Sequence, residues 1–358
     1  MRRMQPLCAA KSLQKYRQNL NFIVTLATIF MDKIKKIILL AFFSLSAFHA
    51  GGQESSAAYS VLKLPASSRV AAQGGENISL IDDGPWAGWA NPALYSSVSS
   101  RSLGLGFMTY AADSKWMGAQ YVQAAGERHT WAVNAQYMGY GSMDETDAEG
   151  TVIGSFSPKD IVVGGGYSYL LSDRWAGGAS LKMVSSRYAD FSAFALAVDL
   201  GVNYFDEERD FSFSAVMRNV GAQLKSFDGR TEKVPFCLQA GFTKGMAHAP
   251  VRFSVTATDL TRWKSTDYLN PDGEKLSFGK KFINHFVVGV EVQPIDAFYL
   301  SAGYNFRRAY ELKAAGSAHG AGLSFGGGLQ LRKFRAGVSY AKYHVSVSSL
   351  MFNVGYVL

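Results

Sequence analysis

Apolar side chains occupy every second position along residues 282–308. They are Phe286, Val288, Val290 and Val292 in the first half, and Phe298, Leu300, Ala302, Tyr304 and Phe306 in the second half. Most positions between them are small, polar or charged, as at Glu291 and Arg307. A period of two residues places successive side chains on opposite faces of a strand, so the segment predicts a two-stranded hairpin with a turn at Pro294. An apolar outer face and a polar inner face are typical of a membrane β-barrel.

The same alternation recurs along the rest of the chain. It predicts strands near residues 101–111, 115–124, 129–140, 158–171, 174–187, 191–204, 210–220, 234–245, 250–260, 282–293, 296–308, 319–331, 333–343 and 346–358. An even number of strands, each about ten residues or longer, is typical of single-chain bacterial barrels. We therefore predict an all-β fold, a transmembrane antiparallel β-barrel of about 14 strands over residues 99–358. The basic residues predicted on its inner face are Lys182, Arg218, Arg252 and Arg335.

The connections between these strands differ in length at the two ends of the predicted barrel. If both chain ends face the periplasm, connections after odd-numbered strands face outward. The two longest, 141–157 and 261–281, both follow odd-numbered strands, although three other odd-numbered connections are short. Long outward loops and short periplasmic turns are typical of outer-membrane barrels.

Residues 53–98 lack sustained alternation and contain small and turn-forming residues instead. Their most conspicuous positions are Gly74, Gly75, Asp82, Asp83, Asn91, Pro92 and Ala93. A polar segment with helical and turn pieces ahead of the first strand predicts a hatch folded inside the barrel, with an ordered periplasmic arm as the alternative. Glycine runs at 164–166 and 326–328 would let neighbouring strands or this hatch approach closely.

From Met31 onward the chain has the features of a secretory signal. Lys33, Lys35 and Lys36 form a basic start, residues 37–48 are apolar, and small residues fit a cleavage before Gln53. The apolar run is too short to span a bilayer. We therefore predict a signal peptide at residues 31–52, and we interpret residues 1–30 as the product of a misassigned upstream start.

The composition agrees with a barrel that has a nonpolar exterior. The 358 residues are 48% hydrophobic and only 18% charged, with 36 glycines. The net charge of +8 belongs to the N-terminus, because residues 1–52 hold eight Lys or Arg and one Asp, which leaves 28 basic and 27 acidic residues beyond them. This balance removes the argument for nucleic-acid binding.

Motifs that would carry catalysis lack their partners. Ser277 and Lys280 have the Ser-x-x-Lys spacing of penicillin-recognising enzymes, but they fall in a predicted loop and no companion motif follows. The histidines are scattered without metal-ligand spacing, and Cys237 loses its only possible partner, Cys8, with the signal. We expect no enzyme activity, no catalytic or metal site and no cofactor.

Several motifs in order along the chain resemble those of a known family, the PorV/PorQ branch of the fatty-acid-transporter-like barrels of Bacteroidetes. They are residues 67–75 (SSRVAAQGG), Asp82-Asp83, 91–94 (NPAL), 137–141 (YMGYG), Asp144-Glu145, 154–156 (GSF), Leu181-Lys182, 219–225 (NVGAQLK), 234–236 (VPF) and 304–308 (YNFRR). Gln73, where the family more often has Leu, and the C-terminal Leu358 depart from the pattern.

This resemblance implies a barrel of about fourteen strands with an N-terminal hatch in the outer membrane. It also implies a non-enzymatic member of the type IX secretion attachment complex, beside PorU-like, PorV-like and PorZ-like proteins. In that complex the PorZ-like partner is held at the cell surface, and the PorU-like enzyme attaches cargo to anionic lipopolysaccharide.

Two functions follow from the sequence. The first is a docking protein embedded in outer-membrane lipid, whose outward loops hold a PorZ-like partner. The residues that we expect to bind partners are Asp144, Glu145, Arg262, Trp263, Lys264 and Tyr268. The alternative is a transporter of hydrophobic small molecules, which needs an apolar pocket against the hatch.

Overall fold

The computed structural model describes residues 59–358, except residues 112, 228, 230, 265–266, 269–275, 313–319 and 345–346. The chain divides into two compact units, Met1–Gln53 and Glu54–Leu358, and every described residue belongs to the second. The predicted upstream start, the signal peptide and the cleavage before Gln53 therefore lie outside the described residues.

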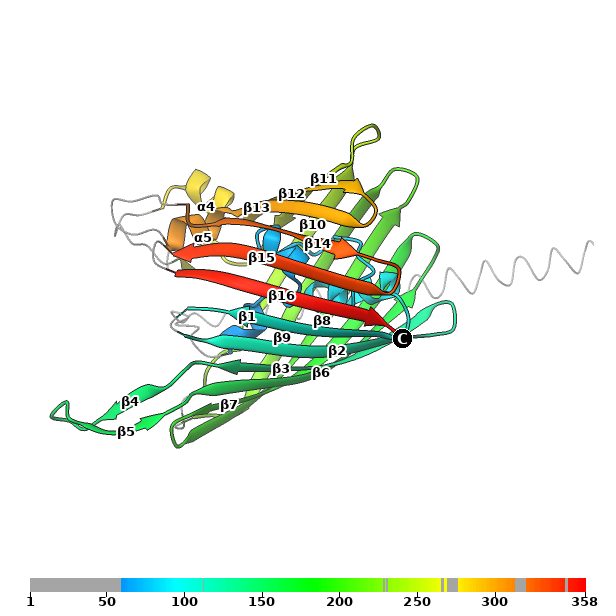
Figure 1. The fold of residues 1–358 in the computed structure, drawn as a ribbon. Helices are drawn as coiled ribbons and strands as arrows, with labels where there is room; N and C mark the ends of the chain where they lie inside the picture. The colour runs from blue at the N-terminus through cyan, green and yellow to red at the C-terminus, as the bar shows by residue number, and fades with distance from the viewer. Residues whose placement is uncertain are drawn as a thin grey trace, which may run out of the picture. The chain divides into compact units, whose positions relative to one another are not determined.

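Among the described residues, fourteen antiparallel strands close into one barrel in which β1 pairs with β16 (Figure 1). The barrel strands are β1 (Ser102–Thr109), β2 (Lys115–Ala125), β3 (His129–Gly139), β6 (Lys159–Leu170), β7 (Trp175–Tyr188), β8 (Phe191–Asp206), β9 (Phe211–Lys225), β10 (Cys237–Gly245), β11 (Val251–Ala257), β12 (Phe286–Ile295), β13 (Phe298–Asn305), β14 (Leu323–Gln330), β15 (Phe334–His344) and β16 (Val347–Val357). Each overlaps a predicted strand, so the predicted fold class is confirmed. In the described part of the chain, no helix is both long and apolar enough to cross a membrane.

The outer face of the barrel is apolar, as the alternation predicts. In β3, Trp131, Val133 and Tyr137 are exposed, whereas Asn134 and Gln136 on the alternate positions are buried. An exposed apolar band on a closed barrel is the surface that meets lipid in outer-membrane barrels.

Residues 59–98, which we call the inner segment, lie within the ring of strands (Figure 1). They form η1 (Ser60–Lys63), α2 (Ser68–Ala72), α3 (Ala87–Ala90) and η2 (Pro92–Ser97). Leu62 and Trp89 of this segment share a buried cluster with Met108, Trp116 and Met351, which point inward from the strands. The interior is therefore only partly polar, because the inner segment buries apolar side chains against apolar residues of the barrel wall.

The two ends of the barrel differ. Short turns join the strands at the end where the chain finishes, and the longer connections gather at the opposite end, which we call the outer rim (Figure 1). At this rim, the 141–157 connection contains β4 (Met143–Thr146) and β5 (Val152–Phe156), which pair in a small sheet of their own. The sequence did not predict this ribbon, since its strands are too short to show alternation.

Helices replace the rim ends of two predicted strands, which corrects the predicted strand bounds. Residues 282–284 belong to α4 (Phe278–Asn284), and residues 306–308 begin α5 (Phe306–Glu311). Side-chain caps explain both helix starts: Ser277 accepts a hydrogen bond from the backbone N–H of Lys280, and Asn305 accepts one from that of Arg308.

Candidate functional site

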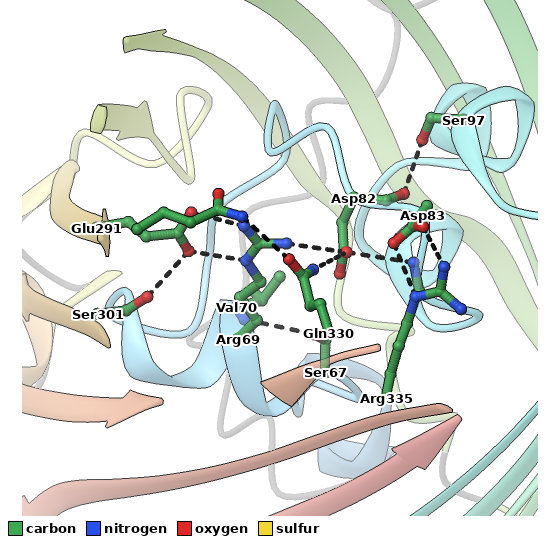
Figure 2. Close-up of polar contacts among 12 residues, drawn as sticks. Ser67, Arg69, Val70, Asp82, Asp83, Ser97, Glu291, Ser301, Gln330 and Arg335 are labelled. Carbon is green, nitrogen blue, oxygen red and sulfur yellow. Dashed lines mark hydrogen bonds and ion pairs between the residues drawn. The ribbon is translucent and has the colours of Figure 1, made fainter. Parts of the chain in front are cut away.

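Arg69 is the central charge of the interface between the inner segment and the barrel wall. It lies on α2, which begins after the capping residue Ser67, and its side chain is 4% exposed. Its Nε and Nη2 donate to the two carboxylate oxygens of Glu291 on β12, at 2.7 and 2.6 Å, and its Nη1 pairs with Asp82 at 2.9 Å (Figure 2). The guanidinium also lies 4.5 Å from the ring centroid of Tyr299. Burial alone would lower the pKa of Arg69, but the two carboxylates outweigh it and hold the guanidinium charged.

Glu291 is satisfied by further donors. The amide of Gln73 donates to its Oε2 at 3.0 Å, and the hydroxyl of Ser301 does so at 3.0 Å. A buried charge is tolerated only when it is paired and hydrogen-bonded, and both members of the Arg69–Glu291 pair meet this condition.

The two aspartates of the predicted hatch motif are also bound. Asp82 accepts from Arg69 and from the backbone N–H of Gly84 at 3.2 Å. Asp83 accepts from Arg335 of β15, with Nε to Oδ1 at 2.8 Å and a second contact from Nη2 (Figure 2). Arg335 thus projects inward, as predicted, and links the wall to the inner segment.

Gly74 and Gly75 end α2 at positions that only glycine occupies easily. Their φ angles are +92° and +89°, and a Cβ at Gly74 would overlap Val287 on the wall. The N–H of Gly74 donates to Ser324 at 2.9 Å, and its carbonyl accepts from Asn305 at 3.3 Å. The backbone of this turn is therefore held directly against β13 and β14.

Asn91, Pro92 and Ala93 start η2 against the opposite part of the wall. The Asn91 side chain accepts from the N–H of Ala93 at 3.0 Å and donates to the carbonyls of Ile78 and Val202, at 3.2 and 3.3 Å. Glycines of the wall make room for this contact. A Cβ would overlap the Pro92–Ala93 backbone at Gly178, Asn91 at Gly201 and Tyr95 at Gly166; in the same way Gly326 lies against Ala72 of α2.

The sequence missed two further ion pairs inside the barrel. Lys182 of β7 lies 2.5 Å from Asp199 of β8 and 4.1 Å from the ring centroid of Trp89 in the inner segment. Arg218 of β9 pairs with Glu76 of the inner segment at 3.5 Å. Both basic residues were predicted on the inner face, but their position alone did not indicate which carboxylates they meet.

The residues predicted to bind partners divide into exposed and internal ones. Asp144, Glu145, Trp263 and Lys264 are exposed at the outer rim. Tyr268 is 6% exposed, and its hydroxyl donates to the carbonyl of Arg262 at 3.1 Å.

Arg262 and Tyr268 belong to a rim network around Asp259. Arg262 pairs with Asp259 at 3.5 Å, Arg307 of α5 pairs with it at 2.5 Å, and Arg307 also lies 4.9 Å from the ring centroid of Tyr268. Burial raises the pKa of Tyr268 to about 12. Burial would also raise the pKa of Asp259, but Arg307 and Arg262 outweigh it and hold that pKa below its usual range.

Ser277 and Lys280, which have the Ser-x-x-Lys spacing, lie at the start of α4. Ser277 starts a helix, contrary to the expectation that it lies in a loop, and its hydroxyl is used as the α4 cap. Within the described ranges, no group of three or more His, Cys, Asp or Glu side chains is arranged to hold a metal ion.

No family model matches the sequence, and no curated protein matches it. Solved structures do match. The Pseudomonas putida toluene transporter TodX has a TM-score of 0.51 and 14% identity, over 82% of this chain and 96% of TodX. The TodX deltaS2S3 mutant, a monoaromatic hydrocarbon channel, has a TM-score of 0.51 and 12% identity, over 81% and 97%. A Pseudomonas aeruginosa FadL homologue has a TM-score of 0.49 and 11% identity, over 82% and 98%. At 12% and 14% identity, the two TodX comparisons show the fold alone: the chain has the closed barrel architecture of these structures.

Proposed function

We propose that this protein is a PorQ-like, non-enzymatic component of a type IX secretion attachment complex, which docks a PorZ-like surface partner at its outer rim. The β4–β5 ribbon is the observation that carries this proposal. All four residues of β4 are exposed, and Val152 and Ile153 of β5 are 57% and 63% exposed. Large apolar side chains on a projecting strand pair are a typical protein-binding feature.

The ribbon suits one kind of partner. Short strands with free edges can accept an added strand from another protein, whose backbone supplies the hydrogen bonds. Asp144 and Glu145 give the ribbon a negative charge, so the complementary partner surface is an extended segment with basic residues.

A filled interior agrees better with docking than with conduction. The pocket between the inner segment and β13–β16, next to Arg69, Trp86 and Arg335, has a volume of about 50 Å³, room for a few water molecules. We propose that residues 53–98 act as a hatch, held by the Arg69, Asp83 and Glu76 ion pairs.

A pull-down from detergent extract tests the docking function. Replacing Val152 and Ile153 together by Ser should lower recovery of the PorZ-like partner by roughly tenfold, the equivalent of about 1.4 kcal/mol. Leu171→Ser with Leu331→Ser is the matched control, because both leucines are exposed at the opposite end of the barrel and their loss should leave recovery unchanged. Undiminished recovery with the ribbon variant would remove the ribbon from the proposal.

Transport of hydrophobic small molecules is the second candidate. The fold similarity to TodX supports transport. The secretion role has no comparable support beyond the sequence resemblance. Transport requires a path past the inner segment. Saturable uptake of labelled toluene or fatty acid into proteoliposomes, changed by substitutions at Arg69 or Gly178, would favour it over docking.

The proposed location is the outer membrane, reached through a Sec signal at residues 31–52. The apolar outer band supports this location. Mass spectrometry of the purified protein tests the processing: a mature N-terminus at Gln53 is the expected result, and a chain that begins near Met1 would contradict it.

A further inference from the structure

Four aromatic side chains form a continuous row at the outer rim. Trp263 stacks on Phe278 with ring centroids 5.9 Å apart, Phe278 on Phe282 at 6.5 Å, and Phe282 meets Phe286 edge-on at 5.0 Å. Phe278 is 74% exposed and Phe282 is 47% exposed, so α4 presents this row to its surroundings. Ile283, 49% exposed, widens the apolar face.

This row is continuous with the outer band of the barrel. Phe286 is the first residue of β12, and the next residue, Val287, is 2% exposed and faces the interior. Because side chains alternate along a strand, Phe286 faces outward together with Val288 and Val290. The apolar face of α4 therefore extends the surface that meets the hydrocarbon of the membrane.

The C-terminal end of α4 is fixed to the rim, so the exposed face of the helix has a defined direction. Asn284 is buried, and the ring of the adjacent His285 is 2% exposed. The two His285 nitrogens lie within hydrogen-bond distance of the Thr258 carbonyl, at 2.8 Å, and of the Tyr268 hydroxyl, at 3.0 Å. These contacts hold the helix against the rim.

Two lysines of α4 lie beside and opposite its aromatic side. Phe278 and Phe282 are four residues apart and share one side of the helix; Lys280 lies opposite them, and Lys281, three residues after Phe278, flanks them. Lys280 is exposed and Lys281 is half-exposed. A short amphipathic helix with aromatic residues on one side and lysines on another is typical of elements that lie at a membrane surface.

We propose that α4 is an interfacial helix inserted in the outer leaflet of the membrane. Phe278 and Phe282 lie among the acyl chains, and Lys280 and Lys281 contact the phosphate groups of anionic lipids. The continuity with the lipid-facing band identifies the occupant as lipid rather than a protein partner. Trp263, expected from the sequence to bind a partner, then belongs to this lipid contact.

The depth of α4 can be measured with a fluorescent dye on a single cysteine. The full mature protein carrying F278C in a C237S background is labelled and placed in nanodiscs of phosphatidylcholine with phosphatidylglycerol. Quenching by spin-labelled acyl chains and shielding from aqueous iodide are the expected results. A dye at V152C, on the exposed ribbon, is the control and should show the opposite behaviour. If the dye at F278C is as accessible to iodide as the dye at V152C, the proposal is overturned.

The affinity for an anionic lipid tests the proposed phosphate contact of Lys280 and Lys281 separately. Native mass spectrometry with phosphatidylglycerol should show binding weakened by roughly fivefold for each lysine removed in K280Q/K281Q, as expected for basic residues close to an anionic surface. R332Q/K333Q removes the same charge from an exposed turn at the opposite end and should have no such effect. Equal phosphatidylglycerol binding by the two double variants would overturn the phosphate contact.

Discussion

The Arg69 guanidinium and the Glu291 carboxylate meet side by side inside the barrel through two hydrogen bonds of 2.7 and 2.6 Å. The two residues are separated by 222 positions in the chain, one in the inner segment and the other on β12. Taking two charges out of water costs about as much as their attraction returns, so such a pair specifies a position more than it adds stability. Here it fixes where α2 sits against the wall.

Removing one member of this pair should be costly. Arg69→Met leaves Glu291 buried with only the more distant Arg252, at 3.9 Å, as a cation, and we expect a loss of about 3–5 kcal/mol in the free energy of unfolding. Denaturant titration in detergent measures this loss, and protease sensitivity of residues 59–98 reports whether the inner segment detaches.

Two further variants distinguish the effect of losing this ion pair from a general effect of removing a charge. Arg69→Met combined with Glu291→Met should recover part of the loss, because the buried carboxylate is removed together with its cation, while Asp82 still lacks Arg69. Arg332→Met removes an exposed charge from a turn and should change stability by less than about 0.5 kcal/mol. A single Arg69→Met variant as stable as Arg332→Met would contradict the role given to the pair.

Glycines of the barrel wall that contact the inner segment should also contribute to the stability of the fold, as the ion pairs do. Gly178→Ala places a Cβ on the backbone of Pro92 and Ala93, so η2 must shift, at a cost of about 1–3 kcal/mol. Gly165→Ala is the matched control, because its Cβ would meet only the Ala132 carbonyl, at 3.6 Å. Thermal unfolding and single-channel conductance should change in the first variant only, and equal behaviour of the two would refute the close contact.

The barrel could be predicted because its signal is local. Positions such as Trp131 and Val133 alternate with buried polar residues over eleven residues of β3, and the pattern repeats strand after strand. The helix α4 was divided between a predicted loop, 261–281, and the start of a predicted strand, 282–293, because seven residues with mixed exposure show no clear period and the helix start depends on one capping residue, Ser277.

The contacts of the inner segment could be anticipated only in part. Gly74 and Asn91 stand out as turn and cap residues, since their roles depend on the neighbouring backbone. The partner of Arg69 could not be found, because nothing in a single sequence links it to Glu291. Tyr268 was expected to be available for binding, but its burial results from tertiary contacts with His285 and Arg307.

Removing the Asn91 side chain should lower the free energy of unfolding more than removing the nearby Ser96 hydroxyl. Asn91→Ala removes the η2 cap and leaves the carbonyls of Ile78 and Val202 without this donor, at a cost of about 1–3 kcal/mol. Ser96→Ala removes one hydrogen bond of 2.8 Å to the Ala93 carbonyl at a half-buried site and should cost about 1 kcal/mol or less. Chemical denaturation of both variants measures the difference, and a larger effect at Ser96 would contradict it.

The rim network around Asp259 should loosen in acid. Burial opposes ionisation of Asp259, but Arg307 and Arg262 outweigh it, so its pKa in the folded protein is lower than in the unfolded chain. A carboxyl with a lowered pKa stabilises the fold above its unfolded pKa, roughly pH 4, and this contribution is lost as the pH falls through the folded value. Amide hydrogen exchange of residues 258–263, corrected for the intrinsic rate, should therefore accelerate below roughly pH 4. Asp259→Asn should remove this acid step and give faster exchange already at neutral pH, whereas Asp144→Asn on the exposed ribbon should leave the step in place. An acid step of equal size in the Asp259→Asn variant would assign it to another group.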